Sequence, residues 1–219
     1  MRTALDVGSR PCSCRRRRHE TVLVAVTGGP GAGKTAVLEM ARKMFCEHVA
    51  VLPEAAGIVF SGGFPRIESK PGRAGAQLAI FHVQRALEYL AHQEPQVAIA
   101  LCDRGTLDGL AYWPLKRSQF FEYTGTSREE EMRRYAAVIH LAPPTQSGGY
   151  RQEGIRVESA EEARRIDARI SAAWSGHPKL FHVASTDDFF RKASQALSLI
   201  RDLLPPCCRE HGIELPQTW

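Results

Sequence analysis

Residues 22–35 read VLVAVTGGPGAGKT. The apolar run 22–26 has the length of a buried strand, a glycine cluster follows it, and helical periodicity begins at about Gly33. Within this stretch Gly28–Thr35 fits G-x-x-x-x-G-K-[ST], the Walker A pattern of a phosphate-binding loop, or P-loop. The alternative is a glycine-rich turn that only joins a strand to a helix. The Lys-Thr pair at the start of the helix favours the P-loop, and therefore a protein that binds a nucleoside triphosphate.

Each residue type in this loop has a chemical reason. Glycines allow backbone conformations that turn successive N–H groups inward, and no Cβ obstructs a phosphate. The N-terminus of the following helix favours an anion. Lys34 is expected to reach the β- and γ-phosphates, with no structural partner of its own, and the Thr35 hydroxyl is expected to bind Mg²⁺. The predicted nucleotide-binding residues are Gly28, Gly29, Pro30, Gly31, Ala32, Gly33, Lys34, Thr35 and Ala36.

Length and composition indicate one globular domain. The chain has 219 residues, of which 43% are hydrophobic and 24% charged, as in soluble proteins with a sizeable core. No apolar stretch approaches the length of a membrane span. The net charge of +5 is carried by residues 1–19, which contain six arginines and one acid. The rest of the chain is therefore neutral, which argues against nucleic-acid binding by the folded domain.

The basic N-terminal segment, residues 1–20, is interpreted as a disordered tail because it contains CRRRRH and lacks periodicity. An unstructured extension is favoured over a targeting segment or an arm that binds polyanions. Its removal is expected to leave nucleotide binding and thermal stability nearly unchanged, since it offers little apolar surface to bury. Residues 21–205 then form the nucleotide-binding domain, and residues 206–219 are a C-terminal extension.

The six cysteines predict no disulfide framework. Cys12 and Cys14 form a Cys-x-Cys pair, Cys207 and Cys208 are adjacent, and neither pair has the spacing of a zinc site. Cys102 lies in an apolar run and is expected to pack as a small hydrophobic residue. The histidines show no metal-binding spacing either. A reducing, cytoplasmic compartment is the default expectation.

Short apolar runs alternate with helical patterns along the rest of the chain. This alternation predicts a parallel sheet that is covered by helices on both faces. We therefore expect a single three-layer α/β/α domain with about five parallel strands and the P-loop strand at its centre. Residues 61–75 are interpreted as a mobile loop. Strands are predicted at 22–26, 49–52, 96–102, 137–141 and 179–184, and helices at 33–47, 77–93, after 127, after 159 and at 187–204.

Two acids follow predicted strands, at the edge where ligands of open α/β sheets bind. Asp103 follows the run VAIALC, as a Walker B acid does, and its carboxylate is expected to hold Mg²⁺ directly or through water. Glu54 follows VAVLP, where a carboxylate can accept a proton from a substrate hydroxyl or position that substrate. The alternative for each acid is a solvated strand end or a helix cap.

Three arginines are candidates for contact with the migrating phosphate, because guanidinium groups stabilise its charge. Arg104 is adjacent to Asp103. Arg151 and Arg156 flank a glycine-containing segment that precedes a helix, which is a pattern typical of a closing lid, with an ordinary loop as the alternative. The catalytic candidates are Lys34, Glu54, Asp103, Arg104, Arg151 and Arg156, and the metal candidates are Thr35 and Asp103.

The segments GGPGAGKT, PEAA, DRGTLDGLAY and IRVESAEEA together resemble one P-loop family, across about residues 22–203. That family includes small bacterial "ATP-binding" AAA proteins, the nicotinamide-riboside kinase domain of NadR, and a eukaryotic protein that binds GTP and phosphoinositides. The order of the segments is also similar to deoxynucleoside kinases. The resemblance implies a catalytic role for Glu54, an acid-arginine pair at Asp103-Arg104, and a lid over 151–158. Those kinases hold the base with an aromatic-Gln pair, whereas AIFHVQRALEYL separates Phe81 from Gln84 by three positions, so base recognition does not carry over.

The expected function is transfer of the ATP γ-phosphoryl group, with Mg²⁺, to a hydroxyl of a small nucleoside-like molecule. A nucleotide-dependent switch or binding module, in which hydrolysis is slow, is the alternative. A motor-type ATPase is disfavoured, because no sensor or arginine-finger domain follows the predicted sheet. The sequence leaves ATP or GTP, the acceptor and the oligomeric state open.

Overall fold

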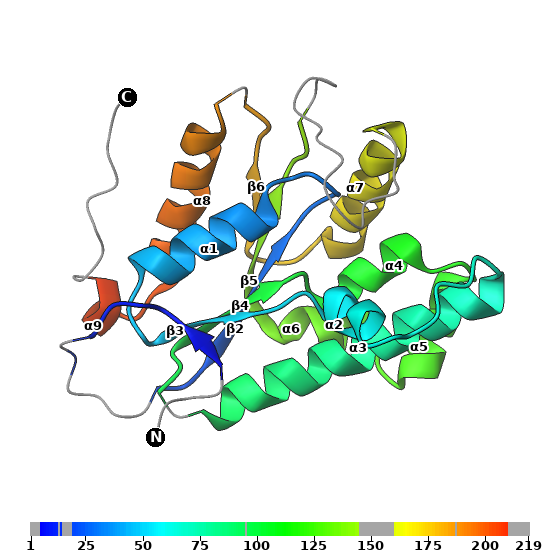
Figure 1. Ribbon diagram of the computed structural model, residues 1–219, viewed down its shortest axis with the longest axis horizontal. Coiled ribbons are helices and arrows are strands. Elements are labelled where there is room, and N and C mark those ends of the chain that lie inside the picture. The colour runs from blue at the N-terminus through cyan, green and yellow to red at the C-terminus, as the bar shows by residue number, and fades with distance from the viewer. Residues whose placement is uncertain are drawn as a thin grey trace.

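The computed structural model describes residues 5–12, 14, 19–94, 96–144, 160–186 and 188–209. Its centre is a six-stranded sheet in the order β1-β3-β4-β2-β5-β6 (Figure 1). The strands β3, β4, β2, β5 and β6 run parallel to one another, whereas β1 pairs antiparallel with β3 at the edge. Their bounds are β1 Asp6–Val7, β2 Val22–Thr27, β3 Val49–Leu52, β4 Ile99–Asp103, β5 Tyr135–Leu141 and β6 Leu180–Val183.

Helices cover both faces of the sheet, which gives the expected three-layer α/β/α architecture (Figure 1). On one face lie α1 and α8, while α3 to α7 lie on the other. The bounds are α1 Lys34–Met44, α2 Ala55–Ser61, α3 Lys70–Gln93, a 3₁₀ turn η1 at Thr106–Asp108, α4 Gly109–Tyr112, α5 Arg117–Thr124, α6 Arg128–Arg133, α7 Ala160–Trp174, α8 Phe189–Leu203 and α9 Pro206–Arg209.

The central strand β2 shows why the sheet is parallel and buried. Leu23 and Ala25 point into one core, with α3 and α7, while Val24 and Val26 point into the other, with α1 and α8. All four side chains are almost fully buried. Because both faces need apolar side chains, the strand reads as a continuous hydrophobic run rather than an alternating one. The predicted central position of the P-loop strand is confirmed, with β4 and β5 as its neighbours.

The N-terminal segment departs from the sequence expectation. Asp6 and Val7 pair with Val51 and Ala50 of β3, and the Gly8 N–H donates to the Val49 carbonyl at 2.8 Å. Disorder is therefore the wrong description of residues 5–12. The composition of this segment shows that it has little apolar surface to bury. It does not show that the backbone N–H and C=O groups at the edge of β3 need hydrogen-bond partners, which this segment supplies. Residues 1–4, 13 and 15–18 lie outside the described part of the chain.

The predicted mobile loop is also shorter than expected. Helix α3 begins at Lys70, seven residues before the predicted start, because Ser69 accepts a hydrogen bond from the Gly72 N–H and a proline occupies the first turn. Sequence periodicity also missed α4 and α5, which are short. The helix predicted after residue 127 is present as α6, and Ser127 and Glu130 form a capping box at its start. No helix in the described ranges is long and apolar enough to cross a bilayer.

Candidate active site

The P-loop connects β2 to α1, and three of its glycines, Gly28, Gly31 and Gly33, have positive φ angles. Gly28 has φ +131°, and a Cβ there would lie 2.1 Å from the Leu141 carbonyl oxygen. Gly33 has φ +85° as the N-cap of α1, a left-handed conformation that side chains disfavour. The Gly29 N–H donates to Asp167 Oδ1 of α7 at 2.7 Å, so this helix contacts the loop directly. The sequence pattern predicted the loop, and its backbone has the required turns.

Lys34 is buried at the base of the loop. Its Nζ donates to the carbonyl oxygens of Gly28 at 2.9 Å and Gly29 at 3.0 Å. The expectation that Lys34 has no structural partner is therefore wrong, because loop carbonyls accept its protons. Burial lowers the pKa of Lys34 to about 7, with a further lowering by Arg104 and an opposing effect of Asp103. A phosphate beside this amine would favour its charged form.

Asp103 ends β4 and lines the same pocket as Lys34 and Thr35. Burial raises the pKa of its carboxyl group to about 6, although Lys34 opposes the rise. The buried oxygen Oδ1 accepts no hydrogen bond from any described residue. An orphaned carboxylate oxygen and an exposed hydroxyl at Thr35 are hard oxygen donors, which Mg²⁺ prefers. These residues therefore fit a magnesium ion.

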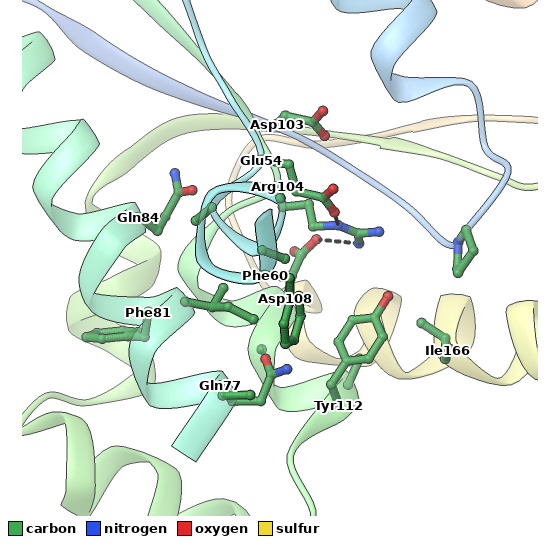
Figure 2. A pocket seen from close by; sticks show the side chains of 18 of the residues that line it. Glu54, Phe60, Gln77, Phe81, Gln84, Asp103, Arg104, Asp108, Tyr112 and Ile166 are labelled. Carbon is green, nitrogen blue, oxygen red and sulfur yellow. Dashed lines mark hydrogen bonds and ion pairs between the residues drawn. The ribbon is translucent and has the colours of Figure 1, made fainter. Parts of the chain in front are cut away.

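Arg104 joins several parts of the site. Its Nε donates to Glu54 Oε1 at 2.6 Å, and its Nη1 lies 3.4 Å from both the Gly28 carbonyl oxygen and Asp108 Oδ2. Figure 2 shows the guanidinium between the two carboxylates. The Arg104 backbone has φ 78°, which is unusual for a residue with a side chain and occurs at functional sites where surrounding contacts enforce it.

Asp108 is a functional candidate that the sequence reasoning missed. Its Oδ2 accepts a hydrogen bond from Thr27 Oγ1 at 2.5 Å, and its Oδ1 accepts one from Trp174 Nε1 at 2.7 Å. The carboxylate thereby links the end of β2 with α7, and it also faces Arg104. The available signal was the second acid of DRGTLD, four residues after Arg104, and the turn between them brings the two side chains within 3.4 Å.

Lys192 is a second missed residue. It is a buried lysine of α8 whose Nζ donates to the carbonyl oxygens of Ala32 in the P-loop and Ala142 after β5. Burial lowers its pKa to about 8. The contact holds the loop against the helix on the α1 face. A lone lysine in an amphipathic helix gives no sequence signal for such a role.

One pocket of about 1040 Å³ contains most of these groups. At one end it is lined by Lys34, Thr35, Glu54 and Asp103, and at the other by side chains of α2, α3, α4 and α7 (Figure 2). This second end combines aromatic rings with amides, a chemistry that suits a planar organic ligand with polar edges. The aromatic residues are Phe60, Phe81 and Tyr112, and the amides are Gln77 and Gln84.

Two of the side chains at the aromatic-amide end, Gln84 and Phe81, already make contacts within the protein. Gln84 is buried and its Nε2 donates to Glu88 Oε1 at 2.9 Å. The Phe81 ring packs edge-on against Phe120, with 5.7 Å between ring centroids. Gln77 lines the pocket with a half-buried side chain, whereas Phe81 and Gln84 are almost fully buried. Gln77 is therefore a better candidate for ligand contact than the Phe81 and Gln84 positions that the sequence singled out.

The predicted site residues fall into two groups. The P-loop residues, Glu54, Asp103 and Arg104 meet at the carboxyl ends of neighbouring strands, as their positions in the sequence indicated. Arg151 and Arg156 lie outside the described residues. The helix that follows them, α7, lines the pocket through Glu162, Ile166 and Arg169.

The fold and the Walker A loop are those of a P-loop NTPase. A profile of the family described as "AAA domain" matches residues 23–192. The match spans well over half of the chain, and the protein belongs to this family. A comparison with curated proteins found no significant match.

Two solved structures show the same fold. The thymidylate kinase from Candida albicans has 12% identity and a TM-score of 0.51, over 85% of this chain and 91% of that one. The NadR protein, solved in complex with NR, has 14% identity and a TM-score of 0.55, over 86% of this chain. The present chain spans about half of NadR, 53% of its length. At these identities the likeness establishes the architecture.

Proposed function

We propose that this protein is a small-molecule kinase that transfers the γ-phosphoryl group of ATP to a hydroxyl group of a nucleoside-like acceptor. The observation that carries the proposal is that one pocket joins the P-loop to the aromatic-amide end, with Glu54 among its lining residues. A nucleotide alone needs the first part of this pocket. A second, organic substrate would occupy the remainder.

The residues at the P-loop end have separate tasks in this proposal. The loop N–H groups and Lys34 bind the phosphates and offset their charge. Thr35 and Asp103 would hold Mg²⁺, which when bound supplies further positive charge to the phosphates. Arg104 already lies 3.4 Å from the Gly28 carbonyl oxygen, so its guanidinium is next to the loop without rearrangement.

Glu54 is proposed as the general base. The acceptor hydroxyl oxygen forms a bond to the γ-phosphorus, the bond to the bridging oxygen of ATP breaks, and ADP leaves with that electron pair. The hydroxyl proton passes to the Glu54 carboxylate. The ion pair between Glu54 and Arg104 fixes the orientation of the Glu54 carboxylate. A correctly oriented base raises the rate of proton transfer.

The acceptor would lie toward Phe60, Gln77 and Tyr112. The ring faces can stack on a planar base, and the Gln77 amide can donate to and accept from its polar edge. The NadR structure, solved with NR, supports this class of acceptor through its fold. Arg151 and Arg156 remain proposed lid residues because the helix they lead into borders the pocket.

A nucleotide-dependent switch is the second candidate, and one observation favours it. The Glu54 carboxylate is already held by Arg104 at 2.6 Å, which suits a structural link between strands as well as a base. In a switch, nucleotide binding alone would change the Arg104 contacts, and no acceptor would be phosphorylated.

The test is a screen of nucleosides for phosphorylated product with Mg²⁺ and ATP or GTP. For a kinase, Glu54→Gln should lower the turnover by roughly 10²–10⁴, while the affinity for Mg·ATP changes by less than about threefold. Glu122→Gln is the matched control, because Glu122 is exposed on α5 and does not line the pocket. Normal turnover of Glu54→Gln would exclude Glu54 as the base, and a wild-type protein that no acceptor stimulates would favour the switch.

A further inference from the structure

Cysteine and histidine side chains that are far apart in the sequence gather beside the sheet, at the opposite end of β3 from the candidate active site. His48 immediately precedes β3, whereas Glu54 follows it. Cys12 and Cys14 come from the N-terminal segment, and Cys208 comes from α9 near the other end of the described chain. We call these four residues the Cys/His cluster. None of them lines the nucleotide pocket.

The distances within the Cys/His cluster are close to those of a metal site. Zinc bonds of about 2.3 Å to sulfur and about 2.0 Å to nitrogen place tetrahedral ligands about 3.5–3.8 Å from one another. Here Cys12 Sγ lies 4.0 Å from Cys208 Sγ, His48 Nδ1 lies 3.3 Å from Cys208 Sγ, and Cys14 Sγ lies 3.8 Å from His48 Nδ1. All four ligand atoms lie within 4.8 Å of one another. Small movements would place them around one ion.

Several backbone contacts explain how the fold brings these residues together. Arg10 forms a β-bridge with Cys46, and the Cys12 N–H donates to Glu47 Oε1 at 3.2 Å, which places the N-terminal segment beside His48. On α9, Cys208 is almost fully buried. Four polar ligands that converge in a partly buried place need either hydrogen bonds or an ion to compensate for their lost hydration.

We propose that Cys12, Cys14, His48 and Cys208 bind a structural Zn²⁺ ion that fastens both ends of the described chain to the β3 edge of the sheet. Three cysteines and one histidine are a common donor set for structural zinc. Binding requires the three thiols to release their protons to solvent, while His48 coordinates through its neutral ring. Local spacing did not predict this site, because tertiary contacts between residues up to 196 positions apart create it.

A second combination shares two of these residues. Cys14, His19, Cys207 and Cys208 also lie within the same distance limit. We assign the ion to the first set because it contains two buried ligands, His48 and Cys208, whereas the second contains one, Cys208. The two sets make opposite predictions for four substitutions, which the following experiment uses.

The experiment measures zinc in the purified full-length protein, and then the absorption of the Co²⁺-substituted protein. We expect about one zinc per chain and a cobalt spectrum with thiolate charge transfer and the intense visible bands of tetrahedral coordination. Cys12→Ser and His48→Ala should lose most of the metal. The matched controls Cys207→Ser and His19→Ala, and Cys102→Ala in β4, should retain it.

Three results would overturn the proposal: purified protein without zinc and with an octahedral cobalt spectrum, retention of metal by Cys12→Ser and His48→Ala, or a disulfide within the cluster of the native protein, found by thiol alkylation and mass spectrometry. If the variants do not fold, the zinc content and cobalt spectrum of the wild type decide. Nucleotide affinity, measured in parallel, tests the P-loop separately, so failure of either proposal leaves the other intact.

Discussion

The Arg104 guanidinium and the Glu54 carboxylate form an ion pair, with 2.6 Å between Nε and Oε1. Glu54 follows β3 and Arg104 follows β4, so the pair connects the ends of two neighbouring parallel strands. Arg104 adopts a left-handed backbone conformation while making this contact. The contacts of the Arg104 guanidinium with Glu54, Asp108 and the P-loop therefore compensate for the strain of its backbone.

Nucleotide binding should take up protons above neutral pH. The pKa of Lys34 is lowered to about 7 by burial in the nucleotide-free protein, so at pH 8 most of this amine is neutral. Bound phosphates would raise its pKa and restore its charge, giving an uptake of up to about one proton per nucleotide. Calorimetric titration of ATP at pH 8 in buffers of different ionisation enthalpy measures this number. A value of zero would contradict the buried, neutral Lys34, and Lys34→Ala should lose tight binding altogether.

Asp103→Asn should stabilise the nucleotide-free protein while it weakens Mg·ATP binding. The folded-state pKa of Asp103 is raised to about 6 from 3.8, so the folded protein binds more protons than the unfolded chain between these values. Stability therefore falls as the pH rises from about 4 to 6, by up to about 3 kcal/mol, and stays low at pH 7. The amide avoids this cost, so the melting temperature at pH 7 should rise in the variant. If the wild type and Asp103→Asn are equally stable at pH 4 and also at pH 7, burial does not disfavour the charged form of Asp103.

Asp108→Ala should destabilise the fold by about 3–5 kcal/mol, because it leaves the Thr27 hydroxyl, the Trp174 indole and the Arg104 guanidinium without a shared acceptor. Urea denaturation of the nucleotide-free protein measures the change. Asp202→Ala is the control, since that carboxylate is 69% exposed and should contribute less than about 1 kcal/mol. If both variants lose a similar free energy of unfolding, Asp108 does not have this structural role.

Deletion of residues 1–19 should lower the melting temperature by several degrees, in contrast to the expectation from composition. The deletion removes the β1 pairing and the packing of Leu5 and Val7 against the core on the α3 face. It should leave ATP affinity unchanged, because no described residue of this segment lines the pocket. The measurements are thermal unfolding in the presence of a metal chelator and calorimetric ATP titration. An unchanged melting temperature would instead support the prediction from composition that this segment does not contribute to stability.

Much of the nucleotide site could be predicted from the sequence, for a physical reason. The P-loop depends on contiguous residues, and Glu54 and Asp103 sit at strand ends that parallel topology brings to one edge. Asp108 was not predicted, since its partners Thr27 and Trp174 meet only through tertiary packing. The same holds for Lys192, whose acceptors are backbone carbonyls of two separate loops.

The pairing of β1 with β3 has a further consequence for the behaviour of the protein at high concentration. An uncovered edge strand presents a row of unpaired N–H and C=O groups, to which a strand of another molecule can add. Here two residues, Asp6 and Val7, occupy that position against Val51 and Ala50, and they place an acidic side chain at the rim. Protection against edge-to-edge aggregation thus resides in a segment outside the region that matches the family, residues 23–192.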